Sequence, residues 1–248
     1  MDDHTVIGRA VAILDAVAST PEPMSLSKLA AETGIPKPTV RRIANQLVAQ
    51  GILCSHPRGY RLGLRLTELG GMAVRQLGSA ELAAPFVHEL HRRTGQIAWI
   101  GAVSGDCLVV LDTAFGREHA GIMSTSWPPK MTLEAVAATA AGRLMMATRA
   151  NGSEQVLRLG LTRLTPYTIT SPRILQDRLR CAAETGQALE HQETRLGWWC
   201  GAALVPGTTT THIVGLTAKM HELPASKGIV QLERIAAGLG RELSKGPY

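Results

Sequence analysis

The sequence lacks several features that would place it in other classes of protein. Phe, Trp and Tyr make up only 4% of the 248 residues, so a buried core must be built mainly from Ala, Leu, Val and Ile. The four cysteines form no Cys-x-x-Cys pair, which indicates reduced thiols and argues against a zinc site or a disulfide framework. The most continuous apolar run, Ala135 to Ala141, is too short to span a bilayer. No long apolar stretch follows the acidic start Met1-Asp2-Asp3, so we expect a soluble cytoplasmic protein without a secretory signal.

Motifs of enzymes are also missing. The sequence contains no Gly-x-Ser-x-Gly elbow, P-loop or His-Glu-x-x-His motif. His88 and His91 have a spacing that can hold a metal ion, but no third ligand is evident and a solvated helix face explains them more simply. Cys107 and Cys200 have no recognisable base partner. We therefore expect no catalytic residue, metal or cofactor, and keep an enzymatic second domain as a remote alternative.

Acidic residues are absent from one stretch of the chain. The net charge of +6 and the isoelectric point near 9.5 favour an anionic partner. Between Ile35 and Thr67 there are six basic residues and no acidic one, whereas the signs are mixed elsewhere. This local bias is better evidence for a nucleic-acid partner than the global charge. The six residues are Lys37, Arg41, Arg42, Arg58, Arg61 and Arg65.

The first sixty residues have the order of elements of a winged helix-turn-helix. Apolar spacing and capping residues predict helices over 6–19, from after Ser25 to Gly34, and from about Lys37 to Gly51. A hairpin is predicted over 52–62, with its turn at Pro57-Arg58-Gly59. Three helices, with a tight turn between the second and third, followed by a hairpin are typical of this DNA-binding fold. In the first helix we expect the core to receive Ile7, Ala10, Val11, Leu14 and Val17.

The exposed side of the third predicted helix has the chemistry of a DNA-reading surface. Arg can bind guanine and Asn can bind adenine through two hydrogen bonds, while Lys and Thr can hold phosphates. The alternatives are that Arg41 and Arg42 form a merely solvated face, and that Arg61 and Arg65 pair with acids near the domain junction. The predicted DNA-binding residues are Lys37, Pro38, Thr39, Arg41, Arg42, Asn45 and Arg58.

The remainder of the chain mixes strands and helices without strict alternation. Residues 64–94 have a helical pattern with weak points at Gly78, Pro85 and Gly70-Gly71, the last being either a flexible point or a close helix crossing. Strands are predicted over 97–103, 107–113, 199–205 and 212–219, and helices over 135–149, 172–185 and 225–244. This pattern predicts an α+β domain. We expect a DNA-binding domain over 1–63, a connecting helix over 64–78 and a second domain over 79–248.

Several motifs, in order along nearly the whole chain, resemble those of IclR-family transcriptional regulators. They are Ser25-Leu26-Ser27-Lys28-Leu29-Ala30, Gly34 to Arg42, Tyr60-Arg61-Leu62-Gly63, Ala140-Ala141-Gly142-Arg143, Thr165 to Thr170, and Gly197 to Cys200. The resemblance implies a winged helix-turn-helix head and a GAF-like α/β domain that binds a small effector. It also implies double-stranded palindromic operators and a homodimer, often a homotetramer, built partly through the head and the connecting helix.

The resemblance places an effector between the sheet and the start of the helix near Ala140. Backbone N–H groups at a helix N-terminus suit a carboxylate. Because Arg143 replaces the usual Lys, Glu190 a common Asp and Trp199 a common Arg, we expect an aromatic or larger carboxylate instead of a two- or three-carbon acid. The effector-binding residues that the resemblance implies are Met123, Ala140, Ala141, Gly142, Glu190, Cys200, Thr217 and Lys219.

Most of these positions have a second explanation that needs no ligand. Cys200 is then a plain buried residue, Lys219 turns to solvent, and the small residues from Ala140 allow close packing of a helix on the sheet. Trp198 and Trp199 belong equally well to a core or an interface. In that case the second domain only oligomerises. A further alternative is that the basic face of the head binds a protein.

Overall fold

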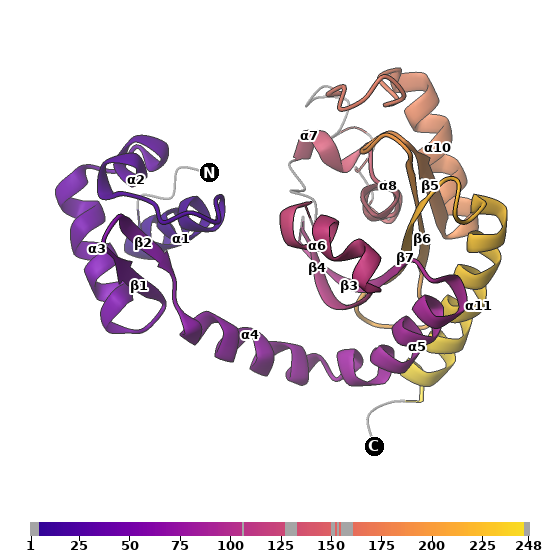
Figure 1. Cartoon of the computed structure of the whole chain (residues 1–248), viewed down its shortest axis with the longest axis horizontal. Coiled ribbons are helices and arrows are strands. Elements are labelled where there is room, and N and C mark those ends of the chain that lie inside the picture. The colour runs from indigo at the N-terminus through magenta and orange to yellow at the C-terminus, as the bar shows by residue number, and fades with distance from the viewer. Residues whose placement is uncertain are drawn as a thin grey trace. The chain divides into compact units, whose positions relative to one another are not determined.

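The computed structural model describes residues 5–105, 107–126, 133–149, 152, 154 and 161–245. The chain divides into two compact units, Met1–Leu77 and Gly78–Tyr248, and each unit has its own apolar core (Figure 1). None of the helices in these ranges is long and apolar enough to cross a membrane.

The first unit is a winged helix-turn-helix, as the sequence predicts. The Ser25 hydroxyl accepts a hydrogen bond from the amide of Lys28 at 3.3 Å and so starts the second helix. Gly34, at a φ of +67°, ends it. Pro38 occupies the first turn of the third helix, where a missing N–H has no cost. The elements are α1 (Val6–Ala18), α2 (Leu26–Thr33), α3 (Lys37–Ala49), β1 (Leu53–His56), β2 (Gly59–Leu62) and α4 (Leu64–Leu77).

The core of the first unit lies between α1, α2, α3 and the hairpin. Its centre contains Ile13, Met24, Leu29, Val40 and Leu53, none more than 1% exposed. The backbone of Met24 also joins the hairpin, because its N–H and C=O each bond to the backbone of Tyr60 at 2.9 Å.

The predicted inner face of α1 was partly wrong. Ile13 and Val17 are buried, but Ile7 is 77% exposed and Val11 is 49% exposed. The buried residues and the exposed ones both have helical spacing, because α1 has apolar residues on two adjacent faces. Packing against α2, α3 and β2 covers the face with Ile13 and Val17 and leaves the face with Ile7 and Val11 in water within this unit.

The second unit is built on a five-stranded sheet in which every neighbouring pair is antiparallel, in the order β4-β3-β7-β6-β5. The helices and strands mix without strict alternation, so the predicted α+β class is confirmed. The elements are α5 (Ser79–Thr94), β3 (Ile97–Ser104), β4 (Cys107–Ala114), the 3-10 turn η1 (Arg117–His119), α6 (Ala120–Ser126), α7 (Leu133–Val136), α8 (Ala140–Ala147), α10 (Pro172–Thr185), β5 (Gln187–His191), β6 (Trp198–Leu204), β7 (His212–Lys219) and α11 (Ala225–Leu243).

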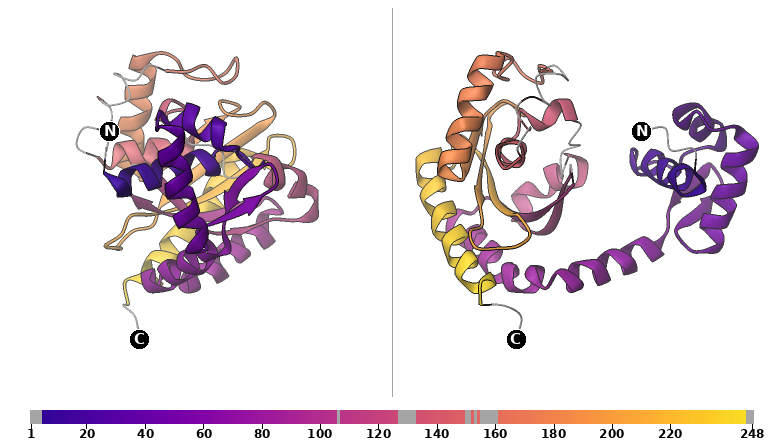
Figure 2. Two further views of the ribbon diagram at one scale, coloured as in Figure 1. Left: turned by 90° about the vertical axis from the view of Figure 1, so that its left-hand side faces the viewer. Right: turned by 180° about the vertical axis from the view of Figure 1, so that it is seen from behind.

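Helices cover both faces of this sheet. On one face α5 and α11 pack through Val87, Leu90 and Leu232. On the other face α8 packs through Ala140 and Leu144, and α10 lies beside α8 and β5. Figure 2 shows α8 and α11 on opposite sides of the strands. Because side chains alternate along a strand, neighbouring residues of β6 enter different cores.

Two of the expected weak points in the helical stretch do not interrupt it. The helix α4 runs through Gly70-Gly71 and α5 runs through Pro85, while Gly78, at a φ of +65°, separates the two helices. A Cβ atom added at Gly70 would meet nothing within 4 Å, and one at Gly71 would meet an Arg75 nitrogen at 3.6 Å. Neither glycine therefore marks a close helix crossing within the described chain.

The single helix expected over 135–149 is divided into α7 and α8. The Thr139 hydroxyl accepts a hydrogen bond from the amide of Gly142 at 2.9 Å and so starts a new helix. Gly142 has room for no Cβ atom, because one would overlap the Val136 carbonyl oxygen. The sequence interpretation also missed β5 and the segment formed by η1 and α6, which carries Met123.

Candidate functional site

The third helix separates an apolar face from a basic face. Val40, Ile43 and Ala44 are buried in the core of the first unit. Thr39 is half-buried at the boundary between the two faces. The exposed residues include all the other positions of α3 that we predict to contact DNA: Lys37, Pro38, Arg41, Arg42 and Asn45.

Two arginines on this face have no competing partner in the part of the chain that the structure describes. Neither the Arg41 nor the Arg42 side chain makes a hydrogen bond or an ion pair there. The Lys37 ammonium donates to the Ser27 hydroxyl at 2.8 Å, and the Tyr60 hydroxyl donates to Asn45 Oδ1 at 3.5 Å. The two guanidinium groups are therefore free to bind an anionic partner without breaking an internal contact.

The other basic side chains of this stretch are less available than the sequence suggests. Arg58, at the hairpin turn, pairs with Glu22 at 2.9 Å, and Arg65 pairs with Glu68 at 2.7 Å. The first contact was missed, because Glu22 lies 36 residues before Arg58. The second is one of the alternatives considered for Arg65. Such exposed ion pairs contribute only about 0–1 kcal/mol, so Arg58 can exchange Glu22 for a phosphate at little cost.

In the second unit the sheet brings three of the predicted effector residues into one row. Glu190 of β5 is opposite Cys200 of β6, which is opposite Thr217 of β7. The Thr217 hydroxyl donates to Cys200 Sγ at 3.3 Å and accepts from Trp99 Nε1 at 3.4 Å. Trp99 is buried in the same apolar cluster as Ala140 and Ala141, with Met123 packed against it.

The two adjacent tryptophans lie on opposite faces of the sheet. Trp198 and Cys200 share one face, and Trp198 packs against the cluster around Trp99. Trp199 is 1% exposed in the other core, where its Nε1 donates to the Leu223 carbonyl at 2.8 Å. Trp199 therefore belongs to a core, one of the two alternatives considered for it, and does not line the face that carries Cys200.

Lys219 lies on the same face as Thr217, two residues further along β7. It is opposite Trp198, and its Nζ is 5.9 Å from the centre of that indole ring. Its ammonium is held by Glu222, whose Oε1 is 2.7 Å away. Lys219 is thus on the side of the predicted site, but its charge is already compensated.

We expected the Gly142 amide to be available to a carboxylate, but the structure shows that it is not. That N–H donates to Thr139, and the residue is buried against Val136. The next residue, Arg143, is 1% exposed. Its Nε donates to the Ala137 carbonyl, its Nη1 to the Leu189 carbonyl at 2.9 Å and its Nη2 to Glu193 Oε2 at 2.5 Å. Arg143 therefore fixes α8 to the strand that carries Glu190.

Glu190 is 2% exposed, and each oxygen of its carboxyl group accepts a hydrogen bond. Its Oε2 accepts from the amide of Glu193 at 2.8 Å, and its Oε1 accepts from the Thr194 hydroxyl at 2.9 Å. Burial raises the pKa of Glu190 to about 7, and these two bonds oppose the rise. Burial, with a smaller contribution from the charge of Glu190, raises the pKa of Cys200 to about 12. Cys200 is therefore a protonated thiol and a poor nucleophile.

Replacing Glu190 should change how stability depends on pH. The pKa of Glu190 is higher in the folded protein than its ordinary value of 4.5, so its contribution to stability is fully present below pH 4.5 and is lost as the pH rises to about 7. Between about pH 5 and about pH 8, the wild type should lose on the order of 2 kcal/mol more unfolding free energy than Glu190→Gln. Urea unfolding of both proteins at the two pH values measures this difference. Equal losses would show that the carboxyl titrates normally.

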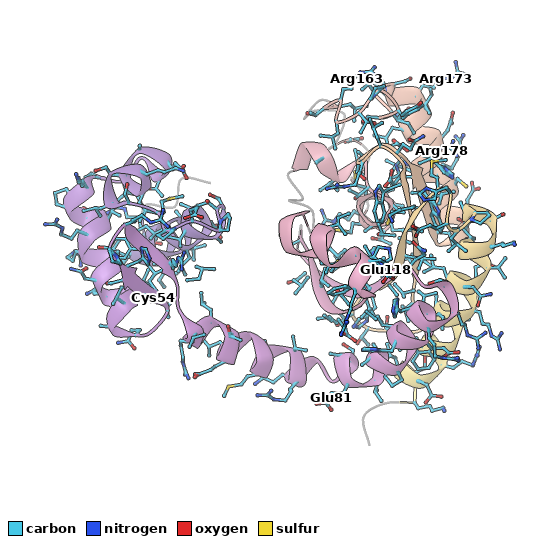
Figure 3. The ribbon with its side chains drawn as sticks, viewed as in Figure 1. Cys54, Glu81, Glu118, Arg163, Arg173 and Arg178 are labelled. Atoms are coloured by element: carbon cyan, nitrogen blue, oxygen red, sulfur yellow. The ribbon has the colours of Figure 1, made fainter. Side chains whose placement is uncertain are left out.

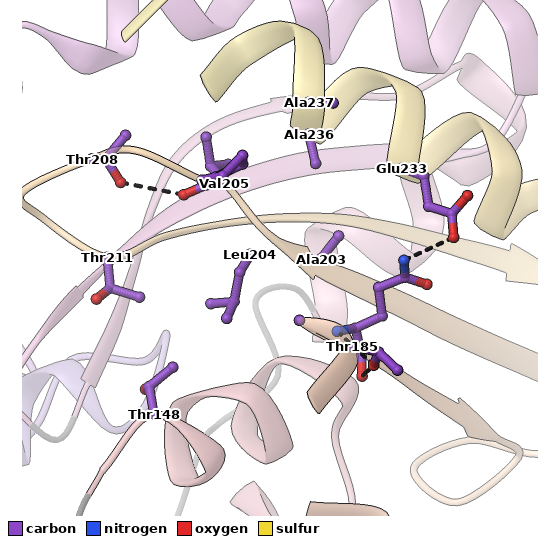
Figure 4. Close-up of a pocket in the computed structure, with 13 residues that line it drawn as sticks. Thr148, Thr185, Ala203, Leu204, Val205, Thr208, Thr211, Glu233, Ala236 and Ala237 are labelled. Atoms are coloured by element: carbon purple, nitrogen blue, oxygen red, sulfur yellow. Dashed lines mark hydrogen bonds between the residues drawn. The ribbon is translucent and has the colours of Figure 1, made fainter. Parts of the chain in front are cut away.

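A separate cavity of about 530 Å³ opens at the end of β6, between the end of α8 and α11 (Figure 4). None of the predicted effector residues lines it. Several of its polar side chains are bonded to one another or to the backbone: Gln187 Nε2 donates to Glu233 Oε1 at 2.8 Å, and the Thr208 hydroxyl donates to the Val205 carbonyl at 3.3 Å. These groups leave few hydrogen bonds for a ligand.

The two histidines considered as metal ligands have separate neighbours. His88 Nε2 lies 3.8 Å from Asp112 Oδ2, and His91 Nδ1 is 2.7 Å from the Gln96 carbonyl oxygen. No group of three or more His, Cys, Asp or Glu residues able to hold a metal ion occurs among the described residues.

Comparison with known proteins assigns both units. Residues 6–57 match the model of the IclR helix-turn-helix domain, and residues 72–228 match the model of the bacterial transcriptional regulator IclR C-terminal domain. The HTH-type transcriptional regulator XynR of Escherichia coli (strain K12) is 26% identical over 246 residues, 96% of each chain. The HTH-type transcriptional regulator BhcR of Paracoccus denitrificans is 29% identical over 201 residues, which are 79% of this chain and 70% of that one.

A solved structure shares the fold over the whole chain. It is an IclR homologue from Microbacterium hydrocarbonoxydans, complexed with 4-hydroxybenzoate. The TM-score is 0.78 at 20% identity, over 98% of this chain and 100% of that one.

Proposed function

The chain belongs to the IclR family of DNA-binding transcriptional regulators, and we propose that it reads a palindromic operator with α3 and changes its operator affinity when a carboxylate effector binds the second unit. The observation that carries the proposal for α3 is its exposed basic face within the matched helix-turn-helix domain, where the side chains of Arg41 and Arg42 have no partner among the described residues.

The contacts of α3 support direct reading of bases in the major groove. Arg41 and Arg42 are exposed and free of internal partners among the described residues, so each can form two hydrogen bonds to guanine. Asn45, one turn after Arg41 and Arg42, has an amide suited to adenine. Lys37, Pro38 and Thr39 at the helix start, and Arg58 in the hairpin, then contact the backbone and set the register.

Exposed apolar side chains support a homodimer, or a tetramer made of two dimers. On α1 they are Val6, Ile7 and Val11, and on α4 they are Leu69 and Met72, each at least 41% exposed. A second copy that covers these faces removes them from water. It also supplies the second α3 that a palindromic site requires, about one helical turn or a multiple of it away. We assign α4 the task of passing a change in the second unit to the head.

The chemistry of the sheet face supports an aromatic carboxylate as the effector. Trp99 and Trp198 present indole rings there, and Glu190, Cys200 and Thr217 supply polar groups in one row. Ala140 and Ala141 begin α8, where the positive end of the helix dipole suits a carboxylate. The 4-hydroxybenzoate bound to the Microbacterium homologue has this chemistry.

The proposed effector role is tested by measuring whether acid binding and operator binding change each other's affinity. Aromatic acids that raise the melting temperature are added to the protein bound to an operator selected from random duplex DNA. We expect at least one acid to change the operator affinity by about fivefold or more, the usual lower range of allosteric coupling. The operator should change the affinity for that acid by the same factor. Acids that bind without moving the operator affinity would contradict an effector role, and an absence of binding would favour a second unit that only oligomerises.

A further inference from the structure

His119 is a fully buried histidine without a hydrogen bond in the described part of the chain. It is 1% exposed, and neither Nδ1 nor Nε2 has a hydrogen-bond partner there. Leaving a buried polar atom unpaired usually costs about 1–3 kcal/mol, so such groups are rare without a functional reason. Two other histidines differ in this respect. His91 has one ring nitrogen 2.7 Å from the Gln96 carbonyl oxygen, and the buried His212 has one ring nitrogen 2.8 Å from the Ser79 hydroxyl.

The position of His119 connects it with the predicted effector residues. It ends η1, and Met123 follows four residues later on the helical segment that continues into α6. Its ring meets Trp198 edge to face, with ring centres 5.9 Å apart at an angle of 65°. Trp198 lies on the same face of the sheet as Cys200 and Thr217. His119 therefore borders the predicted site through its contact with Trp198.

The surroundings of His119 decide what its ring can bind. Burial lowers the pKa of His119, against the opposing effect of Glu118 and Glu222, so the imidazole is neutral. The Oε1 atom of Glu118, a residue labelled in Figure 3, lies 3.3 Å from Nδ1. A carboxylate there favours the tautomer with its proton on Nδ1. Nε2 is then a bare acceptor, and the group that satisfies it must be a donor.

We propose that His119 Nε2 accepts a hydrogen bond from a hydroxyl group of the effector, so that the site selects hydroxylated aromatic acids over the same acids without the hydroxyl. This inference rests on the effector site proposed above. A hydroxyl is a neutral donor that suits a neutral acceptor in an apolar setting, whereas an ionised carboxylate has no proton to donate to Nε2 and would lie near Glu118. The carboxylate end of the ligand is then left for the start of α8.

The test uses matched pairs of acids that differ by one hydroxyl. They are 4-hydroxybenzoate with benzoate, 4-hydroxyphenylacetate with phenylacetate, and 4-hydroxycinnamate with cinnamate. Dissociation constants are measured by calorimetry for the full-length wild type, for His119→Phe and His119→Leu, and for His212→Phe. The last is a matched control, because His212 is also buried but bonds to Ser79.

We expect the wild type to bind at least one hydroxylated acid about tenfold or more tightly than the matched acid without the hydroxyl. The acid without the hydroxyl cannot donate a hydrogen bond to the buried Nε2 of His119. In both His119 variants the two acids of a pair should bind with about equal affinity, whereas the preference should persist in His212→Phe. Without ligand, His119→Phe should melt at or above the wild-type temperature, because it removes an unpaired polar group, whereas His212→Phe should melt lower.

Four results would overturn the inference. Acids that bind without a hydroxyl preference, or whose preference survives in the His119 variants, would reject it and leave the proposed effector function intact. A melting temperature lowered in both His119 variants would show that the imidazole has a structural partner. If none of the six acids binds, both this inference and the aromatic effector class fail.

Discussion

Replacing Arg42 by Ala should weaken operator binding by about 1–3 kcal/mol for each head, which is about fivefold to over a hundredfold. Arg42 is exposed on α3, makes no internal ion pair among the described residues and can form two hydrogen bonds to one guanine. In a dimer the loss occurs twice, so the effect is among the largest that one substitution can have on this protein. Fluorescence anisotropy with operator and random duplexes, at several salt concentrations, measures it.

The pattern of losses separates base reading from general attraction to phosphate. Arg42→Ala should lower operator affinity far more than affinity for random DNA, whereas Lys37→Ala should lower both alike and reduce the salt slope by about 1. Arg178→Ala is the matched control, because Arg178 is also an exposed helical arginine but lies on α10 of the second unit. If Arg42→Ala keeps full discrimination between operator and random DNA, its role in reading bases is wrong.

Replacing Arg143 by Met should lower the free energy of unfolding by about 3–5 kcal/mol. Arg143 is 1% exposed and Glu193, its partner at 2.5 Å, is 5% exposed, so the substitution leaves a buried carboxylate without its cation. The carbonyl oxygens of Ala137 and Leu189 also lose their donors. Urea unfolding of the two proteins measures the loss.

A double variant distinguishes the buried charge from the packing of the arginine. Glu193→Gln removes the uncompensated charge but keeps an acceptor for the amide of Ile169, which bonds to Glu193 Oε2 at 3.1 Å. Arg143→Met combined with Glu193→Gln should therefore recover about half or more of the loss of the single variant. An Arg143→Met protein within about 1 kcal/mol of the wild type would contradict the structural role of this pair.

Elements defined by local signals could be predicted from the sequence. The bounds of α2 follow from the cap at Ser25 and from Gly34, and α10 begins at Pro172 and ends before Gly186, as expected. The hairpin of β3 and β4 follows from its period of two and from the turn that joins the strands. Each of these signals lies within the element itself or next to it.

Features that depend on tertiary contacts could not be predicted. The strand β5 was missed because one of its inward positions is Glu190, a charged residue that hides the alternation of a half-buried strand. The apolar residues of α1 fit two faces, and only packing decides which is buried. The pairing of Arg58 with Glu22 joins residues distant in sequence.

The structure brings only some of the predicted effector residues together. The row of Glu190, Cys200 and Thr217 depends on the register of three strands, which the resemblance supplied and residue patterns alone did not. The placement of Trp199 in the opposite core follows from alternation along β6, once Cys200 is assigned to the site. His119 gave no signal, because a histidine in a polar stretch of sequence does not reveal that it is buried and unpaired.

The most direct test of the whole account is selection of duplex DNA from a random pool by the full-length protein. If two α3 helices read successive major grooves, the enriched sequences should be inverted repeats with half-site centres about 10 base pairs, or a multiple of that, apart. They should lose their enrichment when Arg42→Ala replaces the wild type. Enrichment of unrelated sequences without a repeat, or no enrichment above a salt-sensitive background, would contradict operator recognition by α3.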